Sequence, residues 1–211
     1  MQRIPPITAA LLIANILVFL VQQAQPEFMI AKFALWPLGP HELERLRDGS
    51  VISVGFEIWQ VVTYAFLHGN MAHIAFNMLA LWSIGGQVEL ALGTQRFTVY
   101  YFVCVLGAAA AQLATVALMS TGDPYPTLGA SGGVFGVLIA FAYLFPQARI
   151  MVMVPIPIPA RLAAIGYLAI EFFLGVTGRQ SGVAHFAHLG GALIGFLLLL
   201  YWRSQQQQRR F

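Results

Sequence analysis

Charge is scarce in this sequence: charged residues make up only 9% of its 211 residues, whereas hydrophobic residues make up 59%. So little charge excludes a water-soluble globular fold, because such a chain would expose large apolar surfaces to water. The lysines and arginines stand apart near the ends of apolar segments and form no basic cluster, so we expect no nucleic-acid partner. The solvent of most of the chain is therefore predicted to be a lipid bilayer.

Cysteine is nearly absent as well. Cys104 stands alone, which excludes an internal disulfide, and its place inside an apolar run favours a structural thiol. Metal-binding patterns are also missing, since no His-Glu-x-x-His run occurs. Neither a carboxylate nor a thiolate accompanies the four histidines that flank or enter apolar runs, His68, His73, His185 and His188. We expect no metal and no cofactor.

Long apolar runs, in contrast, recur along the chain and predict an all-α membrane protein. Runs bounded by glycine, proline or charge predict six transmembrane helices, at about residues 7–23, 73–92, 97–119, 131–145, 161–176 and 184–202. We interpret the first as a retained helix, because only Arg3 precedes it and no small-residue cleavage site follows it. A single bundle over residues 1–202 is expected, followed by a polar, disordered tail over 203–211.

The fourth run is short. Its roughly 15 residues, at about 1.5 Å each, span about 22 Å of a hydrocarbon core about 30 Å thick, so Ser131 at its start is expected below the membrane surface. The connection 25–69 mixes acids such as Glu27 with aromatics such as Trp36, which predicts a structured interfacial first loop. Alternating prolines in 151–159 predict an extended connection.

Positive charges in the connections predict the orientation of the bundle. Six spans put both termini on one side, and that side carries seven basic residues against four on the other. The seven are Arg3, Arg96, Arg149, Arg161, Arg203, Arg209 and Arg210, and the four are Lys32, Arg45, Arg47 and Arg179. We expect a multi-pass plasma-membrane protein, of a bacterial inner membrane, with both termini cytoplasmic. Spans two, four and six then enter from the outer face, with their first turns at similar depth.

Polar residues gather in these first turns. The second span carries His73 and Asn77, which are four residues apart and so share one helical face. The fourth begins at Ser131 in a Gly-Ala-Ser-Gly-Gly run, where the free backbone N–H of a helix start can stabilise an anion. The sixth carries two histidines, His185 and His188. A serine, a histidine that can take its proton and donors for an oxyanion therefore converge, which indicates hydrolysis.

Glycines predict that two of these helices approach closely. Gly132 and Gly136 in the fourth span, and Gly191 and Gly195 in the sixth, each leave a small-residue groove at positions i and i+4. If the two grooves face each other, the histidine one turn before Gly191 can reach the serine.

Each element also has a plainer interpretation. Ser131 could serve only as a helix cap, and His73 and Asn77 could bridge helices within lipid. Glu89 and Glu171 are costly in a membrane, so each is expected to pair or to face a wet interior, and a structural role is favoured over catalysis. The Gly-x-Ser-x-Gly run also fits the nucleophile elbow of soluble hydrolases, but a loop rich in glycine and proline stands where that elbow needs a strand.

In these motifs the sequence resembles the rhomboid family of intramembrane proteases, over about residues 59–202. The matched residues are His73 and Asn77 for the family's His-x-x-x-Asn pattern, Gly129, Ser131 and Gly132 for its Gly-x-Ser-Gly, and Ala187, His188 and Gly191 for its Ala-His with small residues after it.

The resemblance implies a catalytic dyad of Ser131 and His188. It also implies an oxyanion hole made of His73, Asn77 and the Ser131 backbone N–H, and an aromatic contact of Phe135 with the His188 ring.

Three other residues are interpreted through the same resemblance. Glu89 fits the family's glutamate at the inner end of the second span, and the register of the sixth span assigns His185 to structure. Gln60 departs from the pattern, because many members carry there an arginine that supports the outer loop, so the stability of this loop is left open.

The implied activity is that of a serine endopeptidase that cuts the transmembrane segments of single-span membrane proteins. The fifth span would be the lateral entrance, and the loop 177–182 would cover a hydrated cavity. No buried aspartate is positioned to orient the histidine, so we expect a slow enzyme relative to triad proteases. Two alternatives differ in class: a non-catalytic rhomboid-like binder or chaperone of membrane helices, and a small transporter or channel, which the lack of an internal repeat disfavours.

Overall fold

A computed structural model describes residues 4–45, 51–119, 125–151, 157–178 and 183–208. Among them, five helical segments are long and apolar enough to cross a membrane: α1 (Pro6–Ala24), Met71–Leu92, α6 (Thr94–Met119), α8 (Ala160–Thr177) and α9 (His185–Gln208). The segment Met71–Leu92 consists of α4 (Met71–Ala80), the π-helical turn η2 (Leu81–Gly85) and α5 (Gly86–Leu92). A shorter apolar helix of 14 residues, α7 (Ser131–Leu144), completes the bundle. The predicted all-α membrane bundle is confirmed.

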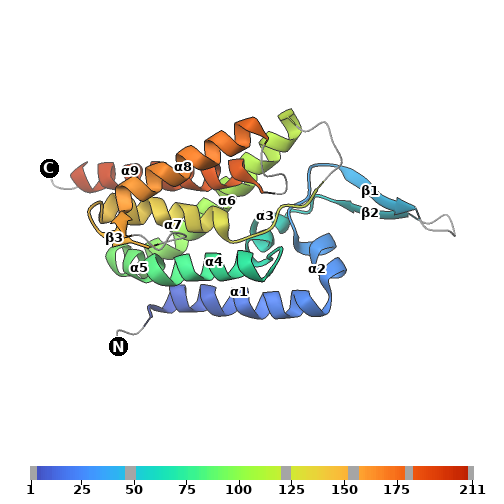
Figure 1. Ribbon diagram of the computed structural model, residues 1–211, viewed down its shortest axis with the longest axis horizontal. Helices are drawn as coiled ribbons and strands as arrows, with labels where there is room; N and C mark the ends of the chain where they lie inside the picture. The colour runs from blue at the N-terminus through green and yellow to red at the C-terminus, as the bar shows by residue number, and fades with distance from the viewer. Residues whose placement is uncertain (1–3, 46–50, 120–124, 152–156, 179–182, 209–211) are drawn as a thin grey trace.

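The helices lie side by side along the long axis of the molecule, with α7 among them (Figure 1). α7 is mostly buried because α6, α8, α9 and the segment α4–η2–α5 all pack against it. α1 begins and α9 ends at one end of the bundle, and a β-hairpin projects beyond the other end (Figure 1). The fourth predicted span is therefore the central one.

The first connection is structured, as predicted. It contains α2 (Pro26–Phe33), the antiparallel strands β1 (Pro40–Arg45) and β2 (Val51–Gly55), α3 (Gln60–Thr63) and the 3₁₀ turn η1 (Tyr64–Phe66). Gln60 is fully buried and holds three parts of this loop together. Its Oε1 accepts from the backbone N–H of Trp36 at 3.2 Å, and its Nε2 donates to the carbonyls of Gly55 at 3.2 Å and Lys32 at 3.4 Å. A neutral amide thus supports the loop at this position.

Two later connections are described in part. The strands β3 (Arg149–Ile150) and β4 (Ile158–Pro159) pair antiparallel at the ends of the proline-rich segment, whose residues 152–156 lie outside the described ranges. Of the loop 177–182, only Thr177 and Gly178 are described. Gly178 ends α8 with a φ of 63°, a left-handed conformation that favours glycine.

The predicted disorder after Trp202 is wrong for the residues described there, because α9 continues to Gln208. Glutamine and arginine are good helix formers, so the helix propagates past the end of the apolar run. Arg203 also donates from Nη1 to the hydroxyl of Tyr143 at 3.2 Å, which ties the end of α9 to α7.

Glu89 is buried and fixes the start of α1. Its carboxylate accepts from the backbone N–H groups of Ile7 at 3.0 Å and Thr8 at 2.7 Å, and from the hydroxyls of Thr8 at 2.8 Å and Thr94 at 3.3 Å. These bonds satisfy the free N–H groups of the first helical turn and place a negative charge at the positive end of the helix dipole. The glutamate therefore pairs within the membrane protein, as its sequence position predicted.

The predicted glycine contact between α7 and α9 holds for three of the four glycines. A Cβ built on Gly191 would overlap the backbone of Gly132, so the two helices meet backbone to backbone there, and a Cβ on Gly136 would lie 3.5 Å from the Gly191 carbonyl oxygen. The prediction is wrong for Gly195, since a Cβ there would run into the side chains of Tyr100 and Cys104 in α6. α6 packs closely against α7 and α9 at this level, and the buried Cys104 thiol fills the space between them.

Candidate active site

Ser131 is the first residue of α7, and a glycine turn sets its position. Gly129 has a φ of 132° and its N–H donates to the Tyr64 carbonyl at 2.9 Å. A residue with a side chain would be strained at this φ, and a Cβ there would also collide with the ring of His73. The glycine therefore lets the chain pass between η1 and α4 and deliver Ser131 to the helix start.

His188 approaches Ser131 from the first turn of α9, 57 residues further along the chain. The His188 Nε2 and the Ser131 Oγ lie 2.7 Å apart, within hydrogen-bonding distance. The ring of Phe135, one turn along α7, stacks on the His188 ring with centroids 4.6 Å apart and an angle of 6° between the planes. Ser131 and His188 thus meet as the sequence predicted, and Phe135 fixes the plane of the imidazole.

His73 and Asn77 lie on the α4 side of the same site. The Asn70 side chain caps α4 by accepting from the His73 backbone N–H at 2.8 Å, which fixes the helix start that carries both residues. The Asn77 Nδ2 is buried and has no hydrogen-bond partner among the described residues. A buried, unpaired amide donor is unusual, because leaving it unsatisfied costs about 1–3 kcal/mol. This N–H group is therefore available to an incoming acceptor.

A cavity of about 570 Å³ joins these residues. Ser131, His188, His73 and Asn77 all line it. Two of its walls face each other: one comes from α4 and η2, with Phe76, Ala80 and Ile84, and the other comes from α8, with Tyr167, Ile170 and Leu174. The segment 125–129 before α7 also lines it. The polar groups therefore stand in a largely apolar space between the segment α4–η2 and α8.

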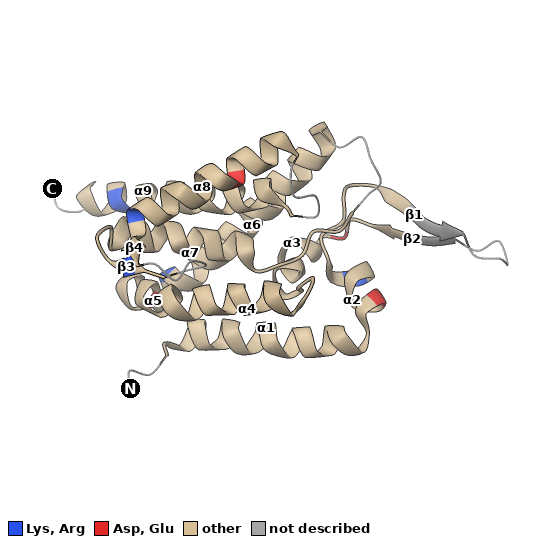
Figure 2. Cartoon of the chain, viewed as in Figure 1, with Lys and Arg blue, Asp and Glu red and all other residues tan. Residues whose placement is uncertain are grey.

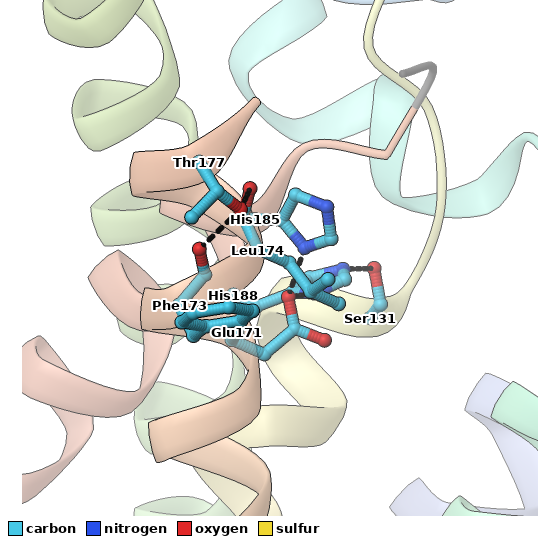
Figure 3. Close-up of polar contacts among 7 residues, drawn as sticks. All are labelled: Ser131, Glu171, Phe173, Leu174, Thr177, His185 and His188. Carbon is cyan, nitrogen blue, oxygen red and sulfur yellow. Dashed lines mark hydrogen bonds and ion pairs between the residues drawn. The ribbon is translucent and has the colours of Figure 1, made fainter. Parts of the chain in front are cut away.

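Glu171 of α8 enters the site, which the sequence did not predict. Its Oε2 lies 2.6 Å from the His185 Nδ1 and 2.9 Å from the His188 Nδ1 (Figure 3). The expectation that no carboxylate accompanies the histidines is therefore wrong. The one signal in the sequence was a lone glutamate in an apolar span, and its partners depend on how α8 is rotated about its axis.

The same three side chains offer ligand atoms within 4.8 Å of one another, a spacing that can suit a metal ion. The two short N to O separations, 2.6 and 2.9 Å, are those of direct hydrogen bonds or ion pairs. Ligands around a tetrahedral zinc at about 2.0–2.1 Å would stand about 3.3 Å apart. These separations therefore fit direct contacts between the carboxylate and the two imidazoles better than they fit zinc coordination.

His68 lies beside the site but outside its lining. Its ring packs edge-on against His73, with centroids 5.1 Å apart, and burial lowers its pKa to about 3. Gln22 of α1 accepts from its backbone N–H at 3.0 Å and donates to its carbonyl at 2.9 Å. A neutral, buried His68 supports the chain just before α4.

Comparison with known proteins shows the family of the chain. Residues 55–205 match the Rhomboid domain. The chain belongs to the rhomboid family. This rhomboid is 32% identical over 191 residues to Rhomboid protein 1, mitochondrial, of Saccharomyces cerevisiae, an alignment that covers 86% of the chain and 54% of the relative.

Two bacterial relatives are also similar. Rhomboid protease GluP of Bacillus subtilis is 33% identical over 150 residues, which are 71% of this rhomboid and 27% of the relative. Rhomboid protease GlpG of Photorhabdus laumondii is 26% identical over 202 residues, which are 93% of this rhomboid and 61% of the relative. The chain spans about a quarter to three fifths of the length of these relatives.

Proposed function

We propose that this rhomboid is an intramembrane serine endopeptidase with Ser131 as nucleophile and His188 as general base. The contact of 2.7 Å between Ser131 Oγ and His188 Nε2, in a cavity inside a membrane bundle, carries this proposal. A hydroxyl is a weak nucleophile until a base takes its proton, and the imidazole stands where it can do so. The names of GluP and GlpG, both rhomboid proteases, support the same activity.

Donors for the developing oxyanion come from the other side of the cavity. As Ser131 Oγ attacks a peptide carbonyl, negative charge gathers on the carbonyl oxygen. The unpaired Asn77 Nδ2, the His73 ring and the free Ser131 N–H at the start of α7 are the groups proposed to hold it. Gly129, Gly132 and Gly191 act by letting these backbones approach.

The proposed substrates are single-span membrane proteins. A hydrogen-bonded helix hides its carbonyls, so the substrate must unwind locally to reach Ser131. The cavity lies between the segment α4–η2 and α8, and α8 exposes bulky apolar residues such as Phe172 on its outer side. Entry of the substrate past α8 is the route that these features support.

The proposed location is a bacterial plasma membrane, with both termini cytoplasmic. Most of the arginine positions coloured in Figure 2 lie at the end of the bundle where α1 begins and α9 ends. The excess of positive charge in the connections at this end supports a cytoplasmic position.

The deciding experiment compares wild type with Ser131→Ala in liposomes that carry a single-span reporter. Cleavage and labelling by a fluorophosphonate, which reacts with activated serines, are both expected in wild type, and both are expected to be lost in the variant. A variant that cuts as fast as wild type contradicts the nucleophile assignment. A wild type that binds the reporter helix without cutting or labelling supports instead the non-catalytic binder or chaperone.

A further inference from the structure

Among the described residues that line the cavity of Ser131, Glu171 is the only acidic one, and it lies on the membrane-spanning helix α8. Its side chain is 15% exposed, and those of His185 and His188 are 6% and 11% exposed. An ionised carboxylate at such a place is costly unless it is paired. Both of its partners belong to the first turn of α9, the turn that carries the general base.

Two contacts lead from Ser131 through His188 to Glu171 of α8, and a third leads from Glu171 to His185 of α9 (Figure 3). Ser131 Oγ meets His188 at Nε2, and Glu171 Oε2 lies 2.9 Å from Nδ1, the opposite nitrogen of the same ring. The same oxygen accepts from His185 Nδ1 at 2.6 Å. The order serine, imidazole, carboxylate is the order that acyl-transfer triads use.

If Glu171 only connected α8 to α9, its contact with His188 would not be needed. The bond to His185 alone would pair the carboxylate and fasten α8 to α9. The carboxylate nevertheless also lies against the ring of the general base, although its approach to Nδ1 is not in line with a hydrogen bond. Phe135 already restrains the plane of the His188 ring. What Glu171 can still control is whether the Nδ1 of that ring carries a proton.

We propose that Glu171 is a positioning residue for His188, with His185 as the group that holds its carboxylate. Resting on the proposed protease function, this assignment extends the two-residue dyad to a Ser131–His188–Glu171 arrangement. The carboxylate favours the neutral tautomer with its proton on Nδ1, and only that tautomer leaves Nε2 free to accept from Ser131.

The proton balance of the reaction is then complete. Ser131 transfers its proton to His188 Nε2 while its Oγ forms a bond to the carbonyl carbon and the carbonyl π electrons move to oxygen. The imidazolium now carries protons on both nitrogens, and Glu171 stabilises it while remaining ionised. Nε2 gives its proton to the leaving amine as the C–N bond breaks, and water repeats the sequence to release Ser131.

The test uses Glu171→Gln and Glu171→Asp in the full chain, reconstituted with the single-span reporter. Glutamine keeps the shape of the side chain but carries an N–H group that can face Nδ1 and select the wrong tautomer. We expect kcat to fall about 10- to 100-fold in Glu171→Gln with KM within about twofold of wild type, which is less than the roughly 10⁴-fold loss in a full triad. Aspartate keeps the charge and is expected to restore part of kcat.

Fluorophosphonate labelling distinguishes an effect of Glu171 on His188 from an effect on the passage of substrate past α8. The probe is small and needs no substrate helix to pass α8, so its rate reports the reactivity of Ser131 alone. We expect labelling to slow in parallel with kcat, in the order wild type, Glu171→Asp, Glu171→Gln. If Glu171 only latches α8, the glutamine variant labels at the wild-type rate and cuts as fast as wild type or faster, or it changes KM alone, and each of these results overturns the proposal.

Two further variants keep the result interpretable. Ser131→Ala must abolish cleavage; if it does not, the proposed function itself has failed, whatever Glu171 does. If Glu171→Gln does not fold, His185→Gln decides, because it removes the ring that holds the carboxylate. A fall in kcat of about threefold or more at constant KM is then expected, and an unchanged kcat counts against the proposal.

Discussion

Asn77 carries a polar group that the folded chain leaves unused. Among the described residues its Nδ2 has no hydrogen-bond partner, whereas the side chain of Asn70 caps α4. Since polar groups that serve the fold are normally hydrogen-bonded, an unpaired buried donor in the cavity points to a task outside the resting fold. Removal of Asn70, which caps α4, and of Asn77, which lies within it, should therefore have different effects.

Asn77→Ala is expected to lower kcat about 10²- to 10³-fold, as the loss of one oxyanion donor does in other acyl-transfer enzymes. The melting temperature in detergent is expected to stay near that of wild type, because no bond of the resting protein is lost. Asn70→Ala is the contrasting variant and should cost about 1 kcal/mol of stability through the lost cap. An Asn77→Ala protein with normal turnover would argue against its place in the oxyanion hole.

Sequence reasoning reached Ser131 and His188 for a physical reason. Each stands in the first turn of an apolar span next to glycines, and the first turns of spans two, four and six share a membrane face because successive spans alternate in direction. The choice of His188 over His185 rested on the family resemblance. Glu171 lies in the middle of a helix, where its neighbours depend on the rotation of α8 about its own axis. That rotation is set by packing of many weakly specific apolar side chains, so a lone glutamate could be predicted to pair but not with whom.

At Gly132 and Gly191, α7 and α9 meet backbone to backbone. Gly191→Ala adds one methyl group against the Gly132 backbone, which cannot yield as a flexible side chain would. We expect a loss of about 1–3 kcal/mol of stability and slower cleavage, because the helices that carry Ser131 and His188 are pushed apart. Thermal melting and reporter cleavage measure the two effects.

Gly166→Ala on α8 is the matched control. A Cβ there meets nothing within 4 Å, and alanine is a better helix former than glycine by about 0.5–1 kcal/mol. This variant should melt at the same temperature as wild type or higher and keep its activity. Equal loss in both variants would mean that the effect comes from any added methyl group and not from the contact of α7 with α9.

Glu89 stabilises the start of α1 by accepting hydrogen bonds from its first turn. Glu89→Gln keeps the shape but replaces an acceptor oxygen by a donor N–H group, which then faces the N–H groups of Ile7 and Thr8. The expected cost is about 1–3 kcal/mol, read as a lower melting temperature. Labelling of Ser131 by a fluorophosphonate at moderate temperature should persist, because Glu89 does not line the cavity. Loss of labelling without a change in melting would contradict this structural assignment.

The whole molecule offers a clean test of orientation because its only cysteine, Cys104, is fully buried. Gln207→Cys near the end of α9 and Leu38→Cys in the first connection place thiols at opposite ends of the bundle. In intact bacterial cells treated with a membrane-impermeant maleimide, we expect the second to react and the first to react only after lysis. The wild-type chain is the background control, and the reverse pattern would overturn the cytoplasmic position of the termini.

Fold class was predictable at this scale because apolar length and scarce charge leave a chain few options other than a helical membrane bundle. The continuation of α9 to Gln208 was not, since a hydropathy boundary marks where lipid ends and not where a helix must stop. The neutral Gln60 at the loop anchor was equally hard to foresee, because its three backbone partners come from separate parts of the loop.

The spanning helices differ in length, and the surrounding lipid must adapt to each of them. α6 has 26 residues and α8 has 18, which at about 1.5 Å per residue correspond to about 39 and 27 Å. We therefore expect hydrophobic mismatch to make the bilayer thinner beside α8 than beside α6. A passing single-span protein with a short or readily tilted apolar stretch would collect in that thinned zone, so the bilayer itself would sort candidates before any side chain touches them.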